Sequence, residues 1–164
     1  SDFLDMLSPD IDILFLCNPN NPTGRLINGA LLDDILARCA ESGIITVLDE
    51  CFIGFTHARS MCERLSDHTS LLVLNAFTKL YGMAGLRLGY LMGSQDMLAN
   101  IGRYGAEWSV SSVAQAAGIG ALSDQTWQER TLTLISAEKK YMEEALTLLG
   151  VTVYHSDTDF NNAK

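Results

Sequence analysis

The 164-residue sequence predicts an α/β fold built around a mostly parallel sheet with helices on both faces. Two observations favour this fold. Short apolar runs of strand length recur through the first 92 residues, and a segment of helical periodicity separates the first run from the second. Strands without a polar face have to be covered on both sides, which an alternation of strands and helices achieves.

Four strands and one helix are expected in this part of the chain. The helix begins after Asn28, which can cap it, and ends near Ser42, ahead of a C-terminal glycine, Gly43. Its apolar residues recur at helical spacing. The four strands are Ile11 to Cys17, Ile44 to Leu48, Leu71 to Leu74 and Leu86 to Met92.

Further helices are expected after residue 93, and the last of them is long. They run from Ser94 to Arg103, from Ser109 to Leu122 and from Asp124 to Leu149. A helix of about 26 residues spans roughly 39 Å, enough to connect two lobes. We therefore expect a partial large domain (1–123), an interdomain helix (124–149) and the start of a small C-terminal domain (150–164). Core packing is expected for three aromatic residues in the helical part: Trp108, Trp127 and Tyr141.

The composition disfavours several classes of protein. Hydrophobic residues make up 48% of the chain, which disfavours disorder, and no apolar run approaches the roughly 18–20 residues of a membrane span. A formal charge of −9 disfavours binding to nucleic acid or to anionic lipid. The N-terminus lacks the pattern of a signal peptide and the sequence lacks a starting Met, and we expect a chain truncated at both ends.

The four cysteines and three histidines predict neither disulfides nor a metal site. No cysteine pair has the C-x-x-C spacing, and the histidines form no metal-ligand pattern. We expect reduced thiols in a cytoplasmic protein.

Three polar side chains follow predicted strands and could meet in one crevice. Asn21 follows the first strand by a few residues, Asp49 directly follows the second, and Lys79 lies just past the third. In open α/β sheets, ligands bind beyond the carboxyl ends of the strands. Arg87 follows Lys79 by eight residues, after a stretch with glycines that can fold back. Each residue alone is more often an ordinary polar residue of a loop or boundary, so only their combination indicates a site.

The order and local sequence of these residues resemble the class I and II aminotransferases, which are fold-type I enzymes that use pyridoxal 5′-phosphate (PLP). Three stretches carry the resemblance: Asn18 to Gly24 (NPNNPTG), Leu48 to Phe52 (LDECF) and Phe77 to Tyr90 (FTKLYGMAGLRLGY). The third is the most specific, because it joins the family lysine to the family arginine at the family spacing. The chain looks most similar to the histidinol-phosphate aminotransferase and threonine-phosphate decarboxylase branch. The resemblance implies a three-layer α/β/α PLP-transferase large domain, present in part.

The resemblance also implies the roles of individual residues. Lys79 would form a Schiff base with the PLP aldehyde and then move protons on the substrate, and Asp49 would keep the pyridine nitrogen protonated; these two are the expected catalytic residues. The other expected cofactor contacts are Asn21 on the ring 3′-oxygen, Cys51 on one ring face, and Thr78 and Arg87 on the phosphate. In this family the bond between Asn21 and Pro22 is often cis.

Two residues depart from the family pattern. Many members have a tyrosine at the position of Phe52, which also bonds the 3′-oxygen, and a serine or threonine at the position of Ala76, which binds phosphate. Neither Phe52 nor Ala76 can make these bonds, so cofactor binding is expected to be weaker or retuned. Phenylalanine at the first position also resembles the decarboxylase branch.

The sequence leaves three functions open. The first is an aminotransferase that moves an amino group between an amino acid and a 2-oxo acid, as a homodimer when full length. The second is a PLP lyase that decarboxylates an amino acid phosphate such as threonine phosphate. The third is a PLP-sensing, aminotransferase-like domain of a transcription regulator. The substrate of either enzyme would be a small molecule, with or without a phosphate, and the chain alone is not expected to turn it over.

Overall fold

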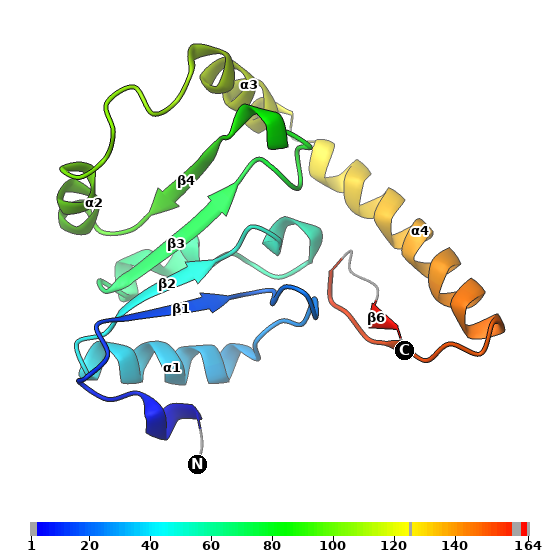
Figure 1. Cartoon of the computed structure of the whole chain (residues 1–164), viewed down its shortest axis with the longest axis horizontal. Helices are drawn as coiled ribbons and strands as arrows, with labels where there is room; N and C mark the ends of the chain where they lie inside the picture. Colours follow the sequence, from blue (N-terminus) through cyan, green and yellow to red (C-terminus); the bar gives the residue numbers. More distant parts are fainter. Residues whose placement is uncertain (1–2, 125, 159–161, 164) are drawn as a thin grey trace.

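A four-stranded sheet forms the centre of the computed structural model, which describes residues 3–124, 126–158 and 162–163 (Figure 1). Its strands lie side by side in chain order: β1 (Ile13–Cys17), β2 (Ile45–Asp49), β3 (Leu71–Ala76) and β4 (Gly89–Met92). β1, β2 and β3 are parallel, and β4 runs antiparallel to β3. The predicted α/β fold with a mostly parallel sheet is confirmed.

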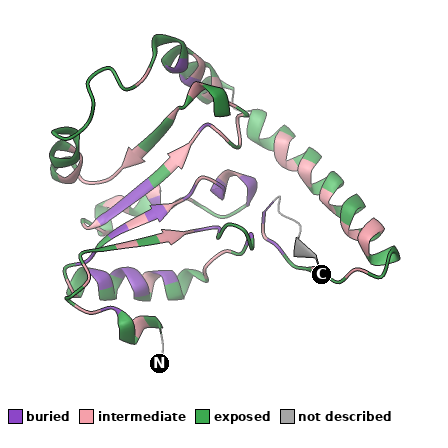
Figure 2. Cartoon of the chain, viewed as in Figure 1, coloured by how far each residue is buried: buried purple, intermediate pink, exposed green. Residues whose placement is uncertain are grey.

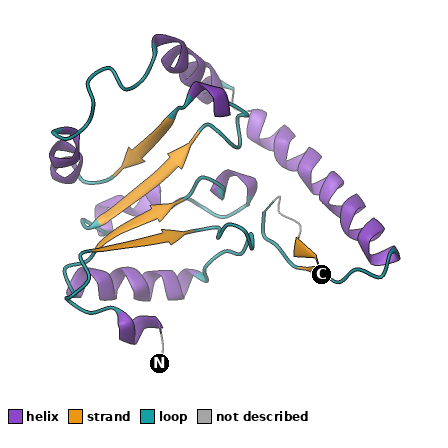
Figure 3. Cartoon of the chain, in the orientation of Figure 1, coloured by secondary structure: helices purple, strands orange, loops and turns teal. Residues whose placement is uncertain are grey.

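α-Helices flank this sheet and extend away from it (Figure 3). They are α1 (Gly29–Glu41), α2 (Gln95–Gly102), α3 (Ser112–Ser123) and α4 (Trp127–Leu148). Short 3₁₀ helices are η1 (Phe3–Met6), η2 (Ile53–Phe55), η3 (Met61–Asp67) and η4 (Ala84–Leu86). A separate antiparallel pair joins β5 (Val153–Tyr154) to β6 (Asn162–Ala163). None of the helices in the described part of the chain combines the length and the apolar character that a membrane span requires.

Helix α1 begins and ends where its capping residues predict. The Asn28 side chain accepts hydrogen bonds from the backbone N–H groups of Ala30 and Leu31. Gly43 has a φ of +74°, the left-handed conformation that a glycine adopts at little cost after a helix. The caps thereby fix the ends of a helix whose buried residues face the core: Leu32, Ile35, Leu36 and Cys39.

The core lies between one face of the sheet and a layer formed by α1 and η3 (Figure 2). Side chains from the sheet and from this layer meet in one cluster: Leu32, Leu36, Leu48, Met61, Leu71 and Val73. A second cluster joins the N-terminal segment to α1 and to the residue just before β2: Leu7, Ile35, Cys39 and Ile44. Burial of these apolar side chains is the main favourable contribution to folding, and it fixes the strands whose ends form the site.

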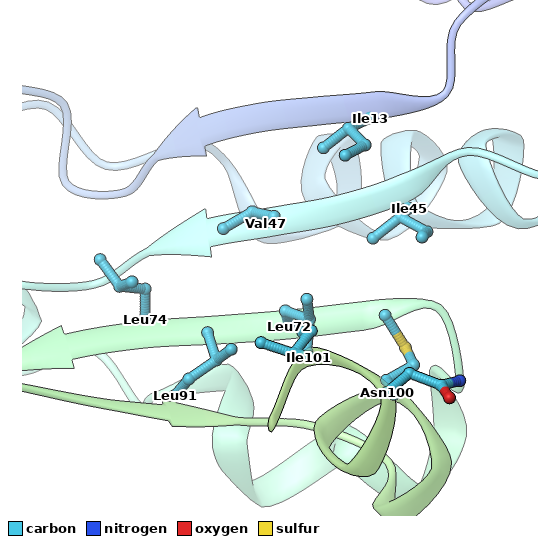
Figure 4. A pocket seen from close by; sticks show the side chains of 9 residues that line it. Ile13, Ile45, Val47, Leu72, Leu74, Leu91, Asn100 and Ile101 are labelled. Carbon is cyan, nitrogen blue, oxygen red and sulfur yellow. The ribbon is translucent and has the colours of Figure 1, made fainter. Parts of the chain in front are cut away.

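The opposite face of the sheet is largely uncovered by the described residues. Side chains from all four strands line an apolar pocket there, and α2 reaches it at one end through Met97, Asn100 and Ile101 (Figure 4). Ile13 is 48% exposed, and Phe15, two residues along the same strand face, is 74% exposed. Helices therefore cover only one of the two faces that were expected to be covered. An apolar strand sequence shows that a face can be buried, but not which segment buries it.

Several predicted details differ from the structure. The fourth strand begins at Gly89 rather than at Leu86, because η4 comes first and Arg87 then adopts a left-handed φ of +53°. The expected core packing of Trp108, Trp127 and Tyr141 is wrong, since these residues are 96%, 38% and 67% exposed. The burial of an aromatic side chain on a helix depends on what packs against it, and the local sequence does not reveal that. Helix α4 is 22 residues long, slightly shorter than predicted.

Candidate active site

The carboxyl ends of the parallel strands and the loops that follow them hold the residues expected to carry the chemistry. Asp49 is the last residue of β2 and pairs in register with Cys17 of β1 and Leu74 of β3. Asn21 lies in the loop after β1, and Lys79 lies in the loop between β3 and β4. All three residues therefore lie at the same edge of the sheet, where ligands bind in open α/β folds.

The Cys51 thiol lies close to both Asp49 and Lys79. The backbone N–H of Cys51 donates to Asp49 Oδ1 at 2.9 Å. Burial, a hydrogen bond to the Asp49 carboxylate and the negative charge of that group raise the pKa of the Cys51 thiol to about 12, while the positive charge of Lys79 acts to lower it. An amine and a carboxylate thus lie near enough to one thiol to affect its ionisation. A thiol with this pKa stays protonated at neutral pH and is a poor nucleophile.

Lys79 is exposed and lies above an aromatic ring. Its Nζ atom is 5.5 Å from the ring centroid of the buried Phe52, which is within the range of a cation–π interaction. The loops that carry these two residues pack closely, since a Cβ atom on Gly54 would come within 2.7 Å of Leu80 Cδ2. The glycine therefore allows the chain after Phe52 to approach the chain after Lys79, and the amine remains accessible to a small molecule.

The loop after β1 is held by hydrogen bonds at both of its ends. The Asn18 N–H donates to the Asp49 carbonyl oxygen at 2.9 Å, and the Asn18 side-chain oxygen accepts from the Ile27 N–H at 2.8 Å. Between them, the Gly24 N–H donates to the Asn20 carbonyl oxygen at 2.7 Å. This bond closes a tight turn around residues 21–23, so the loop has a defined shape beside the carboxyl end of β2.

Asn21 lies in this turn, with Cys17 between it and Asp49. Burial raises the pKa of the Cys17 thiol, a hydrogen bond from the Asn21 backbone N–H lowers it, and the negative charge of Asp49 raises it again. The Asn21–Pro22 bond is cis, as the resemblance implies, and so is the Asn18–Pro19 bond. Asn21 and Asp49 therefore lie near the Cys17 thiol, which is neutral at neutral pH.

Thr78 and Arg87 lie at the neck of the loop between β3 and β4. The Phe77 N–H donates to the Leu88 carbonyl oxygen at 3.1 Å, which extends the antiparallel ladder into the loop. Thr78 and Arg87 are the next residues into the loop, one on each side of this bond. The exposed Arg87 donates from Nη1 to the Ala84 carbonyl oxygen at 3.3 Å, which occupies one of its five N–H donors. A hydroxyl group and a guanidinium are both groups that can bind a phosphate.

The two departures from the family pattern also lie at this edge. Ala76 ends β3 and pairs with Gly89, whose missing side chain leaves room for the Asn75 carbonyl oxygen. Phe52 packs beside Phe55, with ring centroids 6.0 Å apart. Neither side chain has a hydrogen-bonding group, so the structure gives no replacement at these positions for a phenol or a hydroxyl.

Two residues at the start of α4 support the site and were missed by sequence reasoning. The Trp127 indole N–H donates to the Leu80 carbonyl oxygen at 2.7 Å, and Gln128 Nε2 donates to the Gly54 carbonyl oxygen at 3.1 Å. These bonds tie α4 to the loops beside Lys79 and Phe52. The available signal was the indole N–H of Trp127, which needs an acceptor when its ring is partly buried.

Glu50 was also missed, and it is a fully buried carboxyl group directly after Asp49. Its side chain is 0% exposed and accepts hydrogen bonds from the Met61 N–H, at 2.9 Å, and from the Ser60 hydroxyl group. These bonds satisfy donors at the start of η3. Burial raises the pKa of the Glu50 carboxyl group, which the two hydrogen bonds partly offset.

We expect Glu50→Ala to lower the free energy of unfolding by about 3 kcal/mol, because it leaves the Met61 N–H and the Ser60 hydroxyl group without their acceptor. Glu50→Gln keeps the volume and one acceptor oxygen and should cost about 1 kcal/mol. Urea unfolding followed by tryptophan fluorescence measures both values. Equal losses in the two variants would contradict the role assigned to the hydrogen bonds.

The same pair of variants tests the raised pKa. A carboxyl group that binds its proton more tightly in the folded state stabilises the fold most at low pH, and this contribution declines as the pH rises above the unfolded pKa, roughly 4.3. Glutamine does not titrate. We therefore expect the stability of Glu50→Gln, relative to the unmodified protein, to improve as the pH rises from about 4 to about 7.

Known proteins share both the sequence and the fold of this chain. The family model described as aminotransferase class I and II matches residues 2–161. A threonine-phosphate decarboxylase from Salmonella typhimurium is 43% identical over 154 residues, which cover 92% of this chain and 42% of that protein. Histidinol-phosphate aminotransferase 1 from Cupriavidus pinatubonensis is 32% identical over 157 residues, which cover 94% of this chain and 42% of that protein.

A solved structure gives the same result for the fold. The crystal structure of the histidinol-phosphate aminotransferase from Clostridium acetobutylicum matches with a TM-score of 0.84 at 30% identity, and the match covers 91% of this chain and 46% of that one. The chain thus spans less than half the length of each of these relatives.

Proposed function

This chain belongs to the class I and II aminotransferase family, and we propose that the whole protein is a PLP-dependent aminotransferase. It would move an amino group between an amino acid and a 2-oxo acid, with Lys79 as the residue that holds the cofactor. Because the chain spans 42% of the length of its curated relatives, the activity is proposed for the complete protein and not for this chain alone.

The observation that carries the proposal is the position of Asp49 and Lys79 at one edge of the sheet, after the neighbouring strands β2 and β3, with Cys51 hydrogen-bonded to Asp49. An amine can bind the aldehyde on one side of a pyridoxal ring while a carboxylate pairs with the ring nitrogen on the other. Thr78 and Arg87 provide phosphate donors in the loop that also carries Lys79. The donor set therefore fits PLP in its amine, its carboxylate and its anion-binding groups.

Each residue of the candidate site would have its own role in the proposed reaction. When bound, PLP supplies an electron sink for the negative charge that develops on the substrate Cα atom. Lys79 accepts and returns the proton at that atom, and Asp49 holds a proton on the ring nitrogen. Asn21 would donate from its side-chain amide to the ring 3′-oxygen. Cys51 would lie on one side of the ring and, because its thiol stays protonated, would not compete with Lys79 for the aldehyde.

Reductive trapping tests this proposal. The full-length protein is incubated with PLP, reduced with sodium borohydride and digested, and the modified peptide is identified by mass spectrometry. We expect the adduct on Lys79 and, without reduction, exchange of an amino group between an amino acid and a 2-oxo acid. An adduct confined to another lysine, such as the exposed Lys140, would overturn the assignment.

A second candidate is a PLP-dependent lyase that decarboxylates an amino acid phosphate. Two observations favour it: the 43% identity with a threonine-phosphate decarboxylase, and Phe52 at the position where many aminotransferases carry tyrosine. The two functions share Lys79 and Asp49 and differ in the bond to the substrate Cα atom that breaks. Release of carbon dioxide from threonine phosphate without formation of a 2-oxo acid would select the lyase.

Four finer statements accompany the proposal. The substrate carries a phosphate, as the names of the two curated relatives suggest for those proteins. The whole protein is a homodimer, as the family resemblance implies. It is cytoplasmic, which fits the four free cysteines of the described residues.

The chain divides into a large domain (1–123), an interdomain helix (124–149) and the start of a small domain (150–164), of which residues 159–161 and 164 lie outside the described part.

A further inference from the structure

We propose that residues 156–158, named here the clasp, position Asn21 by fixing the loop at residues 20–26, with Asp157 as the positioning residue. The inference rests on the proposed function, because Asn21 acts on the cofactor only if that function is right. The clasp follows α4 by several residues in sequence and lies against a loop more than 130 residues earlier, at the carboxyl edge of the sheet.

Asp157 contacts the loop through its side chain and its backbone. Its Oδ2 atom accepts from the Leu26 N–H at 2.9 Å and lies 3.7 Å from Arg25 Nε, while its own N–H donates to the Gly24 carbonyl oxygen at 2.8 Å. His155 Nε2 lies 2.9 Å from the other carboxylate oxygen. The bond from Leu26, with His155 and Arg25, holds the pKa of Asp157 below its usual value, so the carboxylate is charged at neutral pH.

Gly24 is the point at which the clasp touches the loop most closely. It is buried, has a φ of +64°, and a Cβ atom built on it would lie 2.0 Å from Ser156 Oγ and 2.5 Å from Thr158 Oγ1. Any side chain at this position would therefore push the two segments apart. The same residue donates its N–H to the Asn20 carbonyl oxygen and so closes the turn that holds Asn21. A contact at Gly24 thus acts on the turn itself.

Helix α4 holds the clasp from the other side. Lys139 Nζ donates to the carbonyl oxygens of Ser156 and Thr158, at 2.5 Å and 2.8 Å. Three turns earlier, the Trp127 side chain of the same helix bonds the Leu80 carbonyl oxygen, next to Lys79. One helix therefore braces the lysine loop directly and the asparagine loop through the clasp. This arrangement keeps Asn21 and Lys79 at a fixed separation, which a ring bound by both requires.

The test is a double-mutant cycle on the full-length protein with PLP bound. The visible absorption of bound PLP changes with pH, and the midpoint of this change is the measured quantity. A hydrogen bond from Asn21 favours the ionised form of the group at the ring 3′-oxygen, so losing the bond should raise this midpoint. We expect Asn21→Ala to raise this midpoint by about one unit, and Asp157→Ala to raise it by less and in the same direction. The double variant should match Asn21→Ala alone, because both changes act on the same bond.

Asp34→Ala, which removes an exposed carboxylate on α1, is the matched control and should leave the midpoint unchanged. A merely structural Asp157 would lower the melting temperature of the protein without moving the midpoint, and that result would overturn the proposal. The proposal would also be overturned if the shifts in the midpoint caused by Asn21→Ala and Asp157→Ala were fully additive in the double variant.

Hydrogen exchange tests the clasp without the cofactor. We expect the Leu26 amide to exchange at least tenfold faster in Asp157→Ala, because its acceptor is gone and the loop is released. Unchanged exchange at residues 24–26 would overturn the clasp whatever the protein does with PLP. If exchange rises but the unmodified protein shows no visible PLP band, the proposed function fails, and the role of the clasp in positioning Asn21 for a cofactor fails with it.

Discussion

Lys79→Ala is expected to lower the turnover number of the full-length protein by roughly 10³-fold or more, equivalent to about 4 kcal/mol of activation free energy. Under the proposed function, the variant loses both the amine that would hold the cofactor and the base that would move the proton at the substrate Cα atom. Lys79→Arg should be equally inactive, because it keeps the charge above the Phe52 ring but cannot bind an aldehyde. Steady-state kinetics with saturating PLP, together with borohydride trapping, measures both losses.

Lys140→Ala is the matched control for this prediction. Lys140 is exposed on α4, where its ammonium lies 3.9 Å from Glu144, and its loss should change turnover less than twofold. The Lys79 variants should also melt within a few degrees of the unmodified protein, since an exposed lysine contributes little to stability. More than a tenth of the original turnover in Lys79→Ala would contradict the role of this residue.

The strands could be predicted from sequence because they are apolar along their whole length. The prediction for the second strand begins one residue early, at Ile44, and the structure ends that strand at Asp49, the residue expected to follow it. The antiparallel direction of β4 could not be predicted in the same way. β4 turns back beside β3 because the loop between them is short and is closed by the hydrogen bond from Phe77 to Leu88. Local propensity is evaluated for each of these residues separately and does not reveal that they are in contact.

The candidate site could be predicted as a set of residue types, but its supporting contacts could not. The ends of parallel strands meet by geometry, so Asn21, Asp49 and Lys79 were expected at one edge. Trp127 and Asp157 support that edge from segments distant in sequence, through bonds to backbone atoms. Leu80 provides a backbone carbonyl oxygen and Leu26 provides a backbone N–H group, and every residue except proline has both groups. The sequence therefore does not reveal which distant segment Trp127 or Asp157 bonds.

The uncovered face of the sheet shows a second limit of prediction from the sequence. Ile13 and Phe15 were expected to be buried because their strand is apolar on both sides, but both are exposed. The apolar pattern shows only that both faces of the strand can be covered by other segments. It contains no information on where the covering helix lies in the sequence. The relatives are more than twice as long as this chain, so the remainder of such a protein offers candidates for that cover.

Asp49→Ala is expected to lower turnover by roughly 10²-fold to 10³-fold, because the ring nitrogen loses the charge that keeps it protonated. Asp49→Asn should be similarly impaired, although its amide oxygen can still accept the hydrogen bond from the Cys51 N–H. Asp49→Glu keeps the charge and should retain more activity than either. Equal activities for the asparagine and glutamate variants would show that the charge is not what matters at this position.

The same substitution tests the geometry of the site without any cofactor. The Asp49 carboxylate helps to raise the pKa of the Cys51 thiol to about 12, so Asp49→Asn should lower that pKa and increase the fraction of thiolate at a given pH. We expect Cys51 to react with iodoacetamide several-fold faster in this variant at about pH 9, as measured by peptide mass spectrometry, whereas Asp34→Asn should not change the rate. Lys79→Ala should act in the opposite direction, because the ammonium favours the thiolate. If neither change alters the reactivity of Cys51, the amine and the carboxylate do not share the neighbourhood of this thiol, and one pyridoxal ring could not reach both.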